Sequence, residues 1–259
     1  MSDHEEQPTV RSLDDALRAA AVGGGTRRWL LERAAVGAAG VAAGAALSPA
    51  AAAAGGDGGN SVPAFGRVAV TTEVLTVVLL TELLRRVARH PEVPAAAVAV
   101  IEGAYAAEVD HLRFTREHWR PTTTTFWIPD GIYGGSGDAL DLSVFGQALL
   151  ASETLFVNLY LIGVTVFARE GRETFARYAA ELAGCEAEHR VLASSLIGTS
   201  PPDDVAFEVY SIDRAGGIQQ ALEQAGIGFG AQGAAPGAFY TLANPVMTPR
   251  LQIRSNTPS

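Results

Sequence analysis

The sequence contains no lysine and only one cysteine, Cys185, among its 259 residues. A single cysteine cannot form an internal disulfide, so a small fold held together by disulfide bonds is excluded. Cys185 stands beside Glu186 in a helical pattern, where a cysteine is more typical of a small apolar filler than of a reactive thiol. All basic side chains are arginines, which in so alanine- and glycine-rich a chain indicates genome composition rather than function.

The chain also has fewer basic than acidic side chains. The chain has 19 basic against 28 acidic side chains and a net charge of −9. Its first 54 residues hold six acidic and five basic side chains, so the remainder keeps a net charge near −8. Nucleic acids and anionic membrane surfaces attract basic proteins. The charge therefore argues against a nucleic acid as partner, while the 48% of hydrophobic residues suffices for a sizeable core.

The N-terminal segment has the parts of an export leader. Adjacent Arg27 and Arg28 precede Trp-Leu-Leu and an uncharged, alanine-rich run at 34–56. The run lacks the leucine and isoleucine density of a membrane-spanning helix, and it resembles a twin-arginine leader. We predict export by the twin-arginine machinery to the periplasm, cell envelope or exterior, with a leader at 1–54 and a linker at 55–64. An uncleaved leader that tethers the protein to a membrane, or a tail with a chance arginine pair, is the alternative.

Four long helical patterns follow, and no strand-period repeat stands out. Prolines end or begin several of them, and Asp138 is the predicted N-cap of the third. The connections are short, long and short, with the long one at 121–137, so the first and second helices and the third and fourth should be antiparallel neighbours. The fold class is therefore all-α, a four-helix bundle over residues 65–200 with one long crossover. The predicted helices lie at 65–89, 94–120, 139–169 and 173–196.

The remaining residues, 201–259, form a predicted C-terminal extension. A fifth helix is expected at about 206–224, weakened at Gly216 and Gly217. The segment after it is rich in glycine and proline and is predicted to be irregular.

Two segments carry Glu-x-x-His, namely Glu108 with His111 and Glu186 with His189. Residues three apart lie on one face of a helix, so each pair can point at one spot. A carboxylate together with an imidazole suits iron, manganese or zinc. One such pair arises often by chance, but two pairs on the second and fourth helices of a bundle predict a shared metal site.

The other two helices should each supply one inward glutamate. On the third helix, Glu153 lies in an apolar stripe, where an ionised carboxylate needs compensation. On the first, Glu82 has arginines three and four positions later, which is typical of a solvated ion-pair face. Glu73 is followed at the same phase by apolar residues, and its 35-residue distance to Glu108 nearly matches the 33 residues from Glu153 to Glu186. The predicted ligands are Glu73, Glu108, His111, Glu153, Glu186 and His189.

These motifs resemble the ferritin-like superfamily of two-metal carboxylate proteins, and among them the exported ferritin-like and desiccation-related group. Thr72-Glu73-Val74-Leu75 and Ser152-Glu153-Thr154-Leu155 are similar to the segments with a lone glutamate, and the two Glu-x-x-His segments to the paired ones. The resemblance covers about 65–197 and extends weakly over 201–210. The cysteine pairs of a rubredoxin-like module are missing.

The resemblance implies two iron ions, or manganese as the alternative, that react with oxygen or peroxide. We therefore expect a metal-handling protein or an oxidoreductase. The alternative is a non-catalytic envelope or stress-related protein that uses the bundle as a scaffold, with or without a structural metal. The sequence leaves a homo-oligomer open. It also leaves open whether Tyr105 and Tyr160, on the same helices as predicted ligands, bond to the site or pack in the core.

Overall fold

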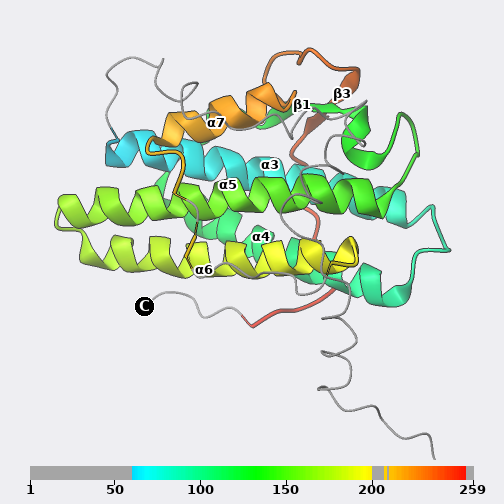
Figure 1. The fold of residues 1–259 in the computed structure, drawn as a ribbon, viewed down its shortest axis with the longest axis horizontal. Coiled ribbons are helices and arrows are strands. Elements are labelled where there is room, and N and C mark those ends of the chain that lie inside the picture. The colour runs from blue at the N-terminus through cyan, green and yellow to red at the C-terminus, as the bar shows by residue number, and fades with distance from the viewer. Residues whose placement is uncertain (1–59, 200–206, 209, 255–259) are drawn as a thin grey trace, which may run out of the picture.

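The computed structural model describes residues 60–199, 207–208 and 210–254, and the predicted export leader lies outside them. The described chain forms five α-helices and a small three-stranded sheet (Figure 1). The helices are α3 (Val62–Val87), α4 (Ala95–His118), α5 (Leu142–Arg169), α6 (Glu173–Leu196) and α7 (Ala215–Gln224). The strands are β1 (Thr125–Pro129), β2 (Gly228–Phe229) and β3 (Gly237–Thr241), and the 3-10 helix η3 (Asp130–Tyr133) follows β1.

Helix α5 begins three residues later than the sequence predicts, because Asp141 rather than Asp138 is its N-cap. The Asp141 carboxylate accepts hydrogen bonds from the backbone N–H groups of Ser143 and Val144, at 2.9 and 3.1 Å. Asp138 forms an ion pair with Arg89 instead, at 2.8 Å. The prediction of Asp138 as the cap was therefore wrong, although α3, α4 and α6 lie within three residues of their predicted bounds.

The four long helices form two antiparallel hairpins, α3 with α4 and α5 with α6, each joined by a short connection (Figure 1). Helix α3 also packs against α5, and α4 against α6. By length and composition α3 and α5 could cross a membrane, but 83% and 61% of their most apolar windows are buried inside the protein. These two helices therefore form the centre of the core.

The crossover between α4 and α5 runs along α3. Its start lies near the beginning of α3, where the Thr122 and Thr71 hydroxyls are 3.3 Å apart. Further on, the Tyr133 hydroxyl donates to the Leu79 carbonyl. At its end, Arg86 near the C-terminus of α3 donates to the carbonyl of Ala139 at 2.7 Å. The long connection therefore spans the bundle, as its length predicts.

The C-terminal segment is not irregular throughout, as the sequence analysis predicts. Strand β1 of the crossover pairs antiparallel with β2 on one side and with β3 on the other. Phe126 and Ile128 of β1 are fully buried, so the sheet closes over the bundle. The strands have two to five residues, too few for a period-two pattern to be distinguished from chance.

The fifth helix is shorter than predicted and begins at Ala215. The residues just before it are held outside a helix by Asn158 of α5, whose amide oxygen accepts from the backbone N–H groups of Ser211 and Ile212. The Asn158 amide nitrogen donates to the Ile212 carbonyl at 2.7 Å. A buried asparagine on the core helix thus fixes the segment that leads into α7, which packs against α3 and α5.

Glu82 does not lie on a solvated face, contrary to the sequence-based interpretation. Its carboxylate accepts from Arg86 at 3.0 Å, and the Arg86 side chain is only 1% exposed. The guanidinium also donates to the Tyr240 hydroxyl and lies 4.3 Å from the Tyr133 ring centroid. The spacing correctly indicates an ion pair, but the crossover and β3 cover it. This buried pair ties both segments to α3.

Glu82→Ala should lower the free energy of unfolding by about 3 kcal/mol, because it leaves a buried guanidinium without its counter-ion. Glu92→Ala, which removes an exposed carboxylate beside His90, should change it by less than about 0.5 kcal/mol. Chemical denaturation of both variants measures the difference. Equal stability of the two variants would contradict a stabilising role for the Glu82–Arg86 pair.

Candidate metal centre

The structure brings all six predicted ligands together in the middle of the bundle. Helices α3 and α5 each supply one glutamate, and α4 and α6 each supply a glutamate and a histidine one turn apart. All six are buried, with exposed fractions from 1% to 8%. The residues are Glu73, Glu108, His111, Glu153, Glu186 and His189. Glu82 is not among them, so the choice of Glu73 on the first helix agrees with the geometry.

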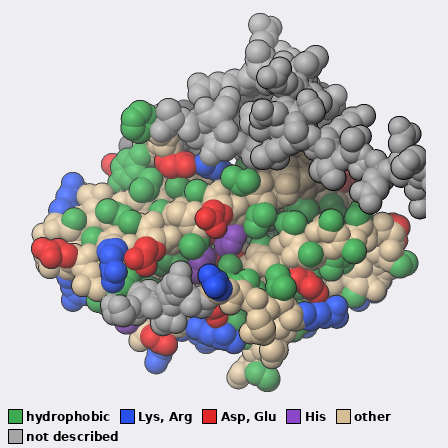
Figure 2. Space-filling view, turned by 90° about the horizontal axis from the view of Figure 1, so that it is seen from below, with side chains coloured by type: hydrophobic (Ala, Val, Ile, Leu, Met, Phe, Trp, Pro, Cys, Tyr) green, Lys and Arg blue, Asp and Glu red, His purple; other side chains and the backbone are tan. Residues whose placement is uncertain are grey.

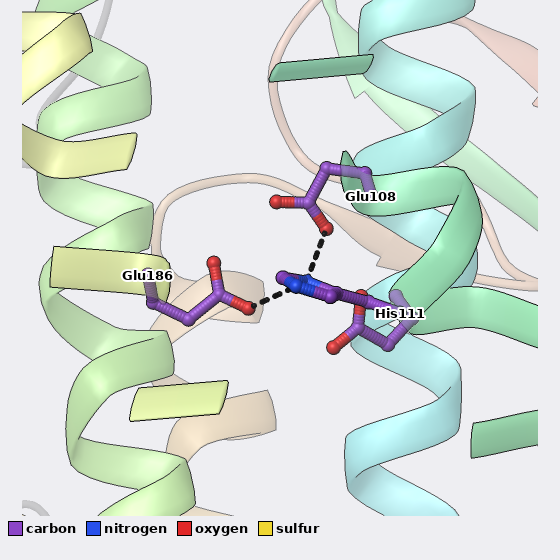
Figure 3. A group of neighbouring side chains, drawn as sticks. Glu108, His111 and Glu186 are labelled. Atoms are coloured by element: carbon purple, nitrogen blue, oxygen red, sulfur yellow. Dashed lines mark ion pairs between the residues drawn. The ribbon is translucent and has the colours of Figure 1, made fainter. Parts of the chain in front are cut away.

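His111 points its Nδ1 atom at three carboxylates. Glu186 Oε1 lies 3.4 Å away, Glu108 Oε2 3.6 Å and Glu73 Oε2 3.9 Å. Figure 3 shows Glu108 and Glu186 on either side of the imidazole edge, so residues from α4 and α6 meet at one nitrogen. The Glu73 carboxylate reaches the same nitrogen from α3.

His189 lies on the other side of the same two carboxylates. Its Nδ1 atom is 2.7 Å from Glu108 Oε1 and 3.1 Å from Glu186 Oε2. The two imidazole rings are 5.7 Å apart between centroids. Each of the two glutamates therefore directs one oxygen at each histidine, which is the disposition of a carboxylate that bridges two centres.

Two overlapping groups of four ligands result. Within each group, one candidate ligand atom per residue lies within 4.8 Å of all the others. Glu73 and His111 belong to the first group, Glu153 and His189 to the second, and Glu108 and Glu186 to both. Carboxylates and imidazoles at these distances could hold metal ions, one in each group.

The donor atoms themselves fit this interpretation. Four buried side-chain atoms make no hydrogen bond: Glu73 Oε2, Glu108 Oε1, His111 Nδ1 and Glu153 Oε2. The 2.7 Å contact of Glu108 Oε1 with His189 lacks hydrogen-bond geometry. Buried polar atoms are otherwise paired in more than nine cases of ten, so four in one cluster need an explanation. Metal coordination provides one that serves all of them.

Burial and repulsion between carboxylates raise the pKa of Glu73 and Glu153, each of which belongs to only one of the two groups. Burial raises the pKa of Glu73 well above its ordinary value, and the charge of Glu108 raises it further. Burial likewise raises the pKa of Glu153, with added repulsion from Glu186 and Glu108. Without a metal these two carboxyls therefore bind protons more readily than an exposed glutamate does.

Glu108 and Glu186, which belong to both groups, have lowered pKa values, whereas the pKa values of both histidines are raised. Burial alone would raise the pKa of Glu108, but the neighbouring His189 and His111 hold it below its ordinary value. The pKa of Glu186 is lowered by the same two rings in spite of its burial and the Glu108 charge. Burial disfavours the imidazolium forms, yet the carboxylates raise the pKa of both histidines. Glu108 and Glu186 thus favour their ionised forms, and His111 and His189 favour their protonated forms.

The two nearby tyrosines differ. The Tyr160 hydroxyl donates to Glu73 Oε1, the oxygen that the His111 contact leaves free. Tyr105 donates instead to the Met247 carbonyl, so it ties the C-terminal segment to α4. The sequence does not distinguish the two tyrosines, because the residue that Tyr160 meets lies on another helix, α3.

Cys185 is not merely an apolar filler. It is half-buried, and its side chain forms a polar contact with His111 that favours the protonated ring. His118, at the end of α4, packs against the rings of Phe114, Trp119 and Phe175 and lies outside the cluster. The sequence gives no sign of the Cys185 contact, because the two residues lie on different helices.

Solvent comes closest to the cluster at the histidines. The side chains of His111 and His189 are 10% and 6% exposed. The four glutamates of the cluster are each 3% exposed or less. Figure 2 shows the face of α4 and α6, where histidine atoms reach the surface among hydrophobic and charged side chains.

No family model, curated protein or solved structure matches the chain. The functional argument therefore rests on the residues and geometry of the chain itself.

Metal binding should release about four protons for each pair of ions, because ligands must lose their protons to bind. These are the carboxyl protons of Glu73 and Glu153 and the imidazolium protons of His111 and His189. Since all four pKa values are raised, lower pH strengthens proton competition, and affinity should fall steeply with decreasing pH. Calorimetric titration in buffers of different ionisation enthalpy counts the protons.

Glu153→Gln provides the control for this count, since glutamine has no proton to release at that position. Release of no protons by the unaltered protein would show that the raised pKa values do not describe the metal-free cluster.

Proposed function

We propose that this chain is a ferritin-like protein that binds two metal ions between its four long helices. The observation that carries the proposal is the sharing of Glu108 and Glu186 by two four-ligand groups. The order of helices supports it: two antiparallel hairpins joined by a long crossover, with the lone glutamates on α3 and α5 and the Glu-x-x-His pairs on α4 and α6.

The charge of the ligand set suits two divalent ions. Four ionised carboxylates offset four positive charges, which makes the buried, loaded site nearly neutral. Mixed carboxylate and imidazole ligands suit iron, manganese or zinc, and the resemblance to the ferritin-like superfamily implies iron, with manganese as the alternative. Glu108 and Glu186 would bridge the ions, while Glu73 with His111 and Glu153 with His189 would each complete one end.

The chemistry that such a pair of ions supplies is electron exchange with oxygen or peroxide. The protein contributes an apolar enclosure around buried candidate ligands, of which the two histidines are the most exposed. We infer a metal-handling protein or an oxidoreductase. Export by the twin-arginine route belongs to the same proposal and rests on Arg27 and Arg28 and the run after them.

Metal analysis of variants tests the binding proposal. Purified protein reconstituted with ferrous iron should hold about two ions per chain. Glu186→Gln should lose both, because Glu186 belongs to both groups, while Glu153→Ala and His189→Ala should chiefly empty one. Glu188→Gln is the matched control: it lies on the same helix, two residues from Glu186, and is exposed. Equal iron content in the Glu186→Gln and Glu188→Gln variants would refute the site.

A redox experiment separates an enzyme from a scaffold. Anaerobic, iron-loaded protein mixed with oxygen or peroxide should develop near-ultraviolet absorption as the iron is oxidised, and the Glu186→Gln variant should not. Manganese-loaded protein is assayed in parallel for conversion of peroxide to water and oxygen. If both loaded forms stay unreactive while metal strongly raises the unfolding temperature, the metal serves as a structural staple of a non-catalytic protein.

A further inference from the structure

A cavity of about 170 Å³ lies between the C-terminal half of α3 and the segment around β3. One buried water needs about 10–15 Å³ of such volume, so the cavity has room for about ten water-sized groups. None of the six candidate metal ligands lines it. The cavity is therefore separate from the candidate metal centre and has the size of a site for a small metabolite.

Two side chains of opposite charge line the cavity, Glu82 and Arg85, and its other lining residues are uncharged. The Glu82 side chain is only 10% exposed, whereas that of Arg85 is 58% exposed and so stands at the opening. Their closest atoms, Arg85 Nη1 and Glu82 Oε2, are 4.0 Å apart, which is too far for a hydrogen bond. Both groups therefore keep the capacity to bind a third partner.

The two oxygens of Glu82 have different surroundings. Oε1 accepts a hydrogen bond from Arg86 at 3.0 Å, within the buried pair that ties the crossover and β3 to α3. Oε2 accepts no hydrogen bond from any residue that the structure describes, although the side chain is nine-tenths buried. A carboxylate oxygen so deeply buried normally has a donor, because leaving it unpaired costs free energy. A donor placed in the cavity would supply that hydrogen bond.

The rest of the wall offers one more donor and an apolar surface. The Tyr240 hydroxyl accepts from Arg86 at 3.2 Å, and among the described residues none accepts its proton. Phe239 is 49% exposed, an unusual exposure for so large an apolar side chain, and it lines the cavity together with Val78 and Ala243. Few polar groups beside an apolar wall are typical of a pocket that fixes the orientation of a small ligand.

We propose that this cavity binds a free α-amino acid with an apolar side chain of about the size of leucine. The ammonium group of the ligand donates to Glu82 Oε2. Its carboxylate pairs with the Arg85 guanidinium and accepts from the Tyr240 hydroxyl. Its side chain packs against Phe239 and Val78. The site needs no metal, so it is independent of the proposed metal centre.

The charges of the cavity select this class of ligand. Glu82 repels a simple anion and Arg85 repels a simple cation, whereas a zwitterion is attracted by both. An α-amino acid carries its ammonium and carboxylate groups on one carbon atom, so both can reach partners that are themselves 4.0 Å apart. The volume of the cavity limits the side chain to a few carbon atoms.

The test titrates the purified protein with L-leucine in a calorimeter, and we expect saturable binding of one molecule per chain. Arg85→Gln should weaken binding by about tenfold, which corresponds to one lost hydrogen bond between charged groups. Arg89→Gln is the matched control, because Arg89 is also exposed but pairs with Asp138 outside the cavity. Ala243→Leu fills part of the cavity and should abolish binding, and its unfolding temperature without ligand shows whether the fold is kept.

Two analogues of leucine test the role of each charge. 4-Methylpentanoate lacks the ammonium group and 3-methylbutylamine lacks the carboxylate, so each should bind about tenfold more weakly than leucine or worse. Because amino acids also coordinate metal ions, Glu186→Gln is titrated as well, and it should bind leucine as tightly as the unaltered protein. The proposal is refuted by any of three results: no saturable binding of leucine at millimolar concentration, equal affinity in Arg85→Gln and Arg89→Gln, or loss of binding in Glu186→Gln.

Discussion

The burial of four carboxyls and two imidazoles at the centre of an apolar bundle is the constraint on which the rest of the structure depends. Such groups cannot be left charged and unpaired in that environment, since the cost would exceed the stability of an ordinary domain. The fold meets this cost by placing the groups on four different helices, so that each can reach a partner. Protons offset part of the charge of the cluster without metal, and a bound metal ion would replace them.

The same constraint explains why the surroundings are so firmly tied together. Candidate ligand atoms from four helices come together only if the helices keep their relative rotation and register. The short hairpin connections cannot enforce this alone. The crossover is fixed to α3 along its length, and the buried Arg86 joins its end to α3 and β3. Asn158 performs a similar task for the segment before α7. Polar contacts far from the cluster thus hold its geometry.

The helices and the clustering of the six candidate ligands could be predicted from the sequence because both depend on spacing along a helix. Glu-x-x-His places two donor side chains on one face of a helix whatever surrounds it. Glu73 differs from Glu82 in the apolar residues that follow it on the same face of the helix. The burial of Glu82 could not be predicted, since the residues that cover it come from the crossover and from β3. The short strands could not be predicted for the same reason, because β1 is stabilised by partners about a hundred residues away.

The tyrosines show where local reasoning stops and what the fold adds. Tyr105 and Tyr160 have equal claims in the sequence, yet one bonds to a backbone carbonyl and the other to a candidate ligand. Both contact α3, but Tyr160 meets the Glu73 carboxylate there, whereas Tyr105 meets Thr81. A core that needed only hydrophobic filling would gain nothing from a hydroxyl at this position, because burying it requires an acceptor. Glu73 is that acceptor, so the Tyr160 hydroxyl belongs to the same buried polar cluster as the candidate ligands.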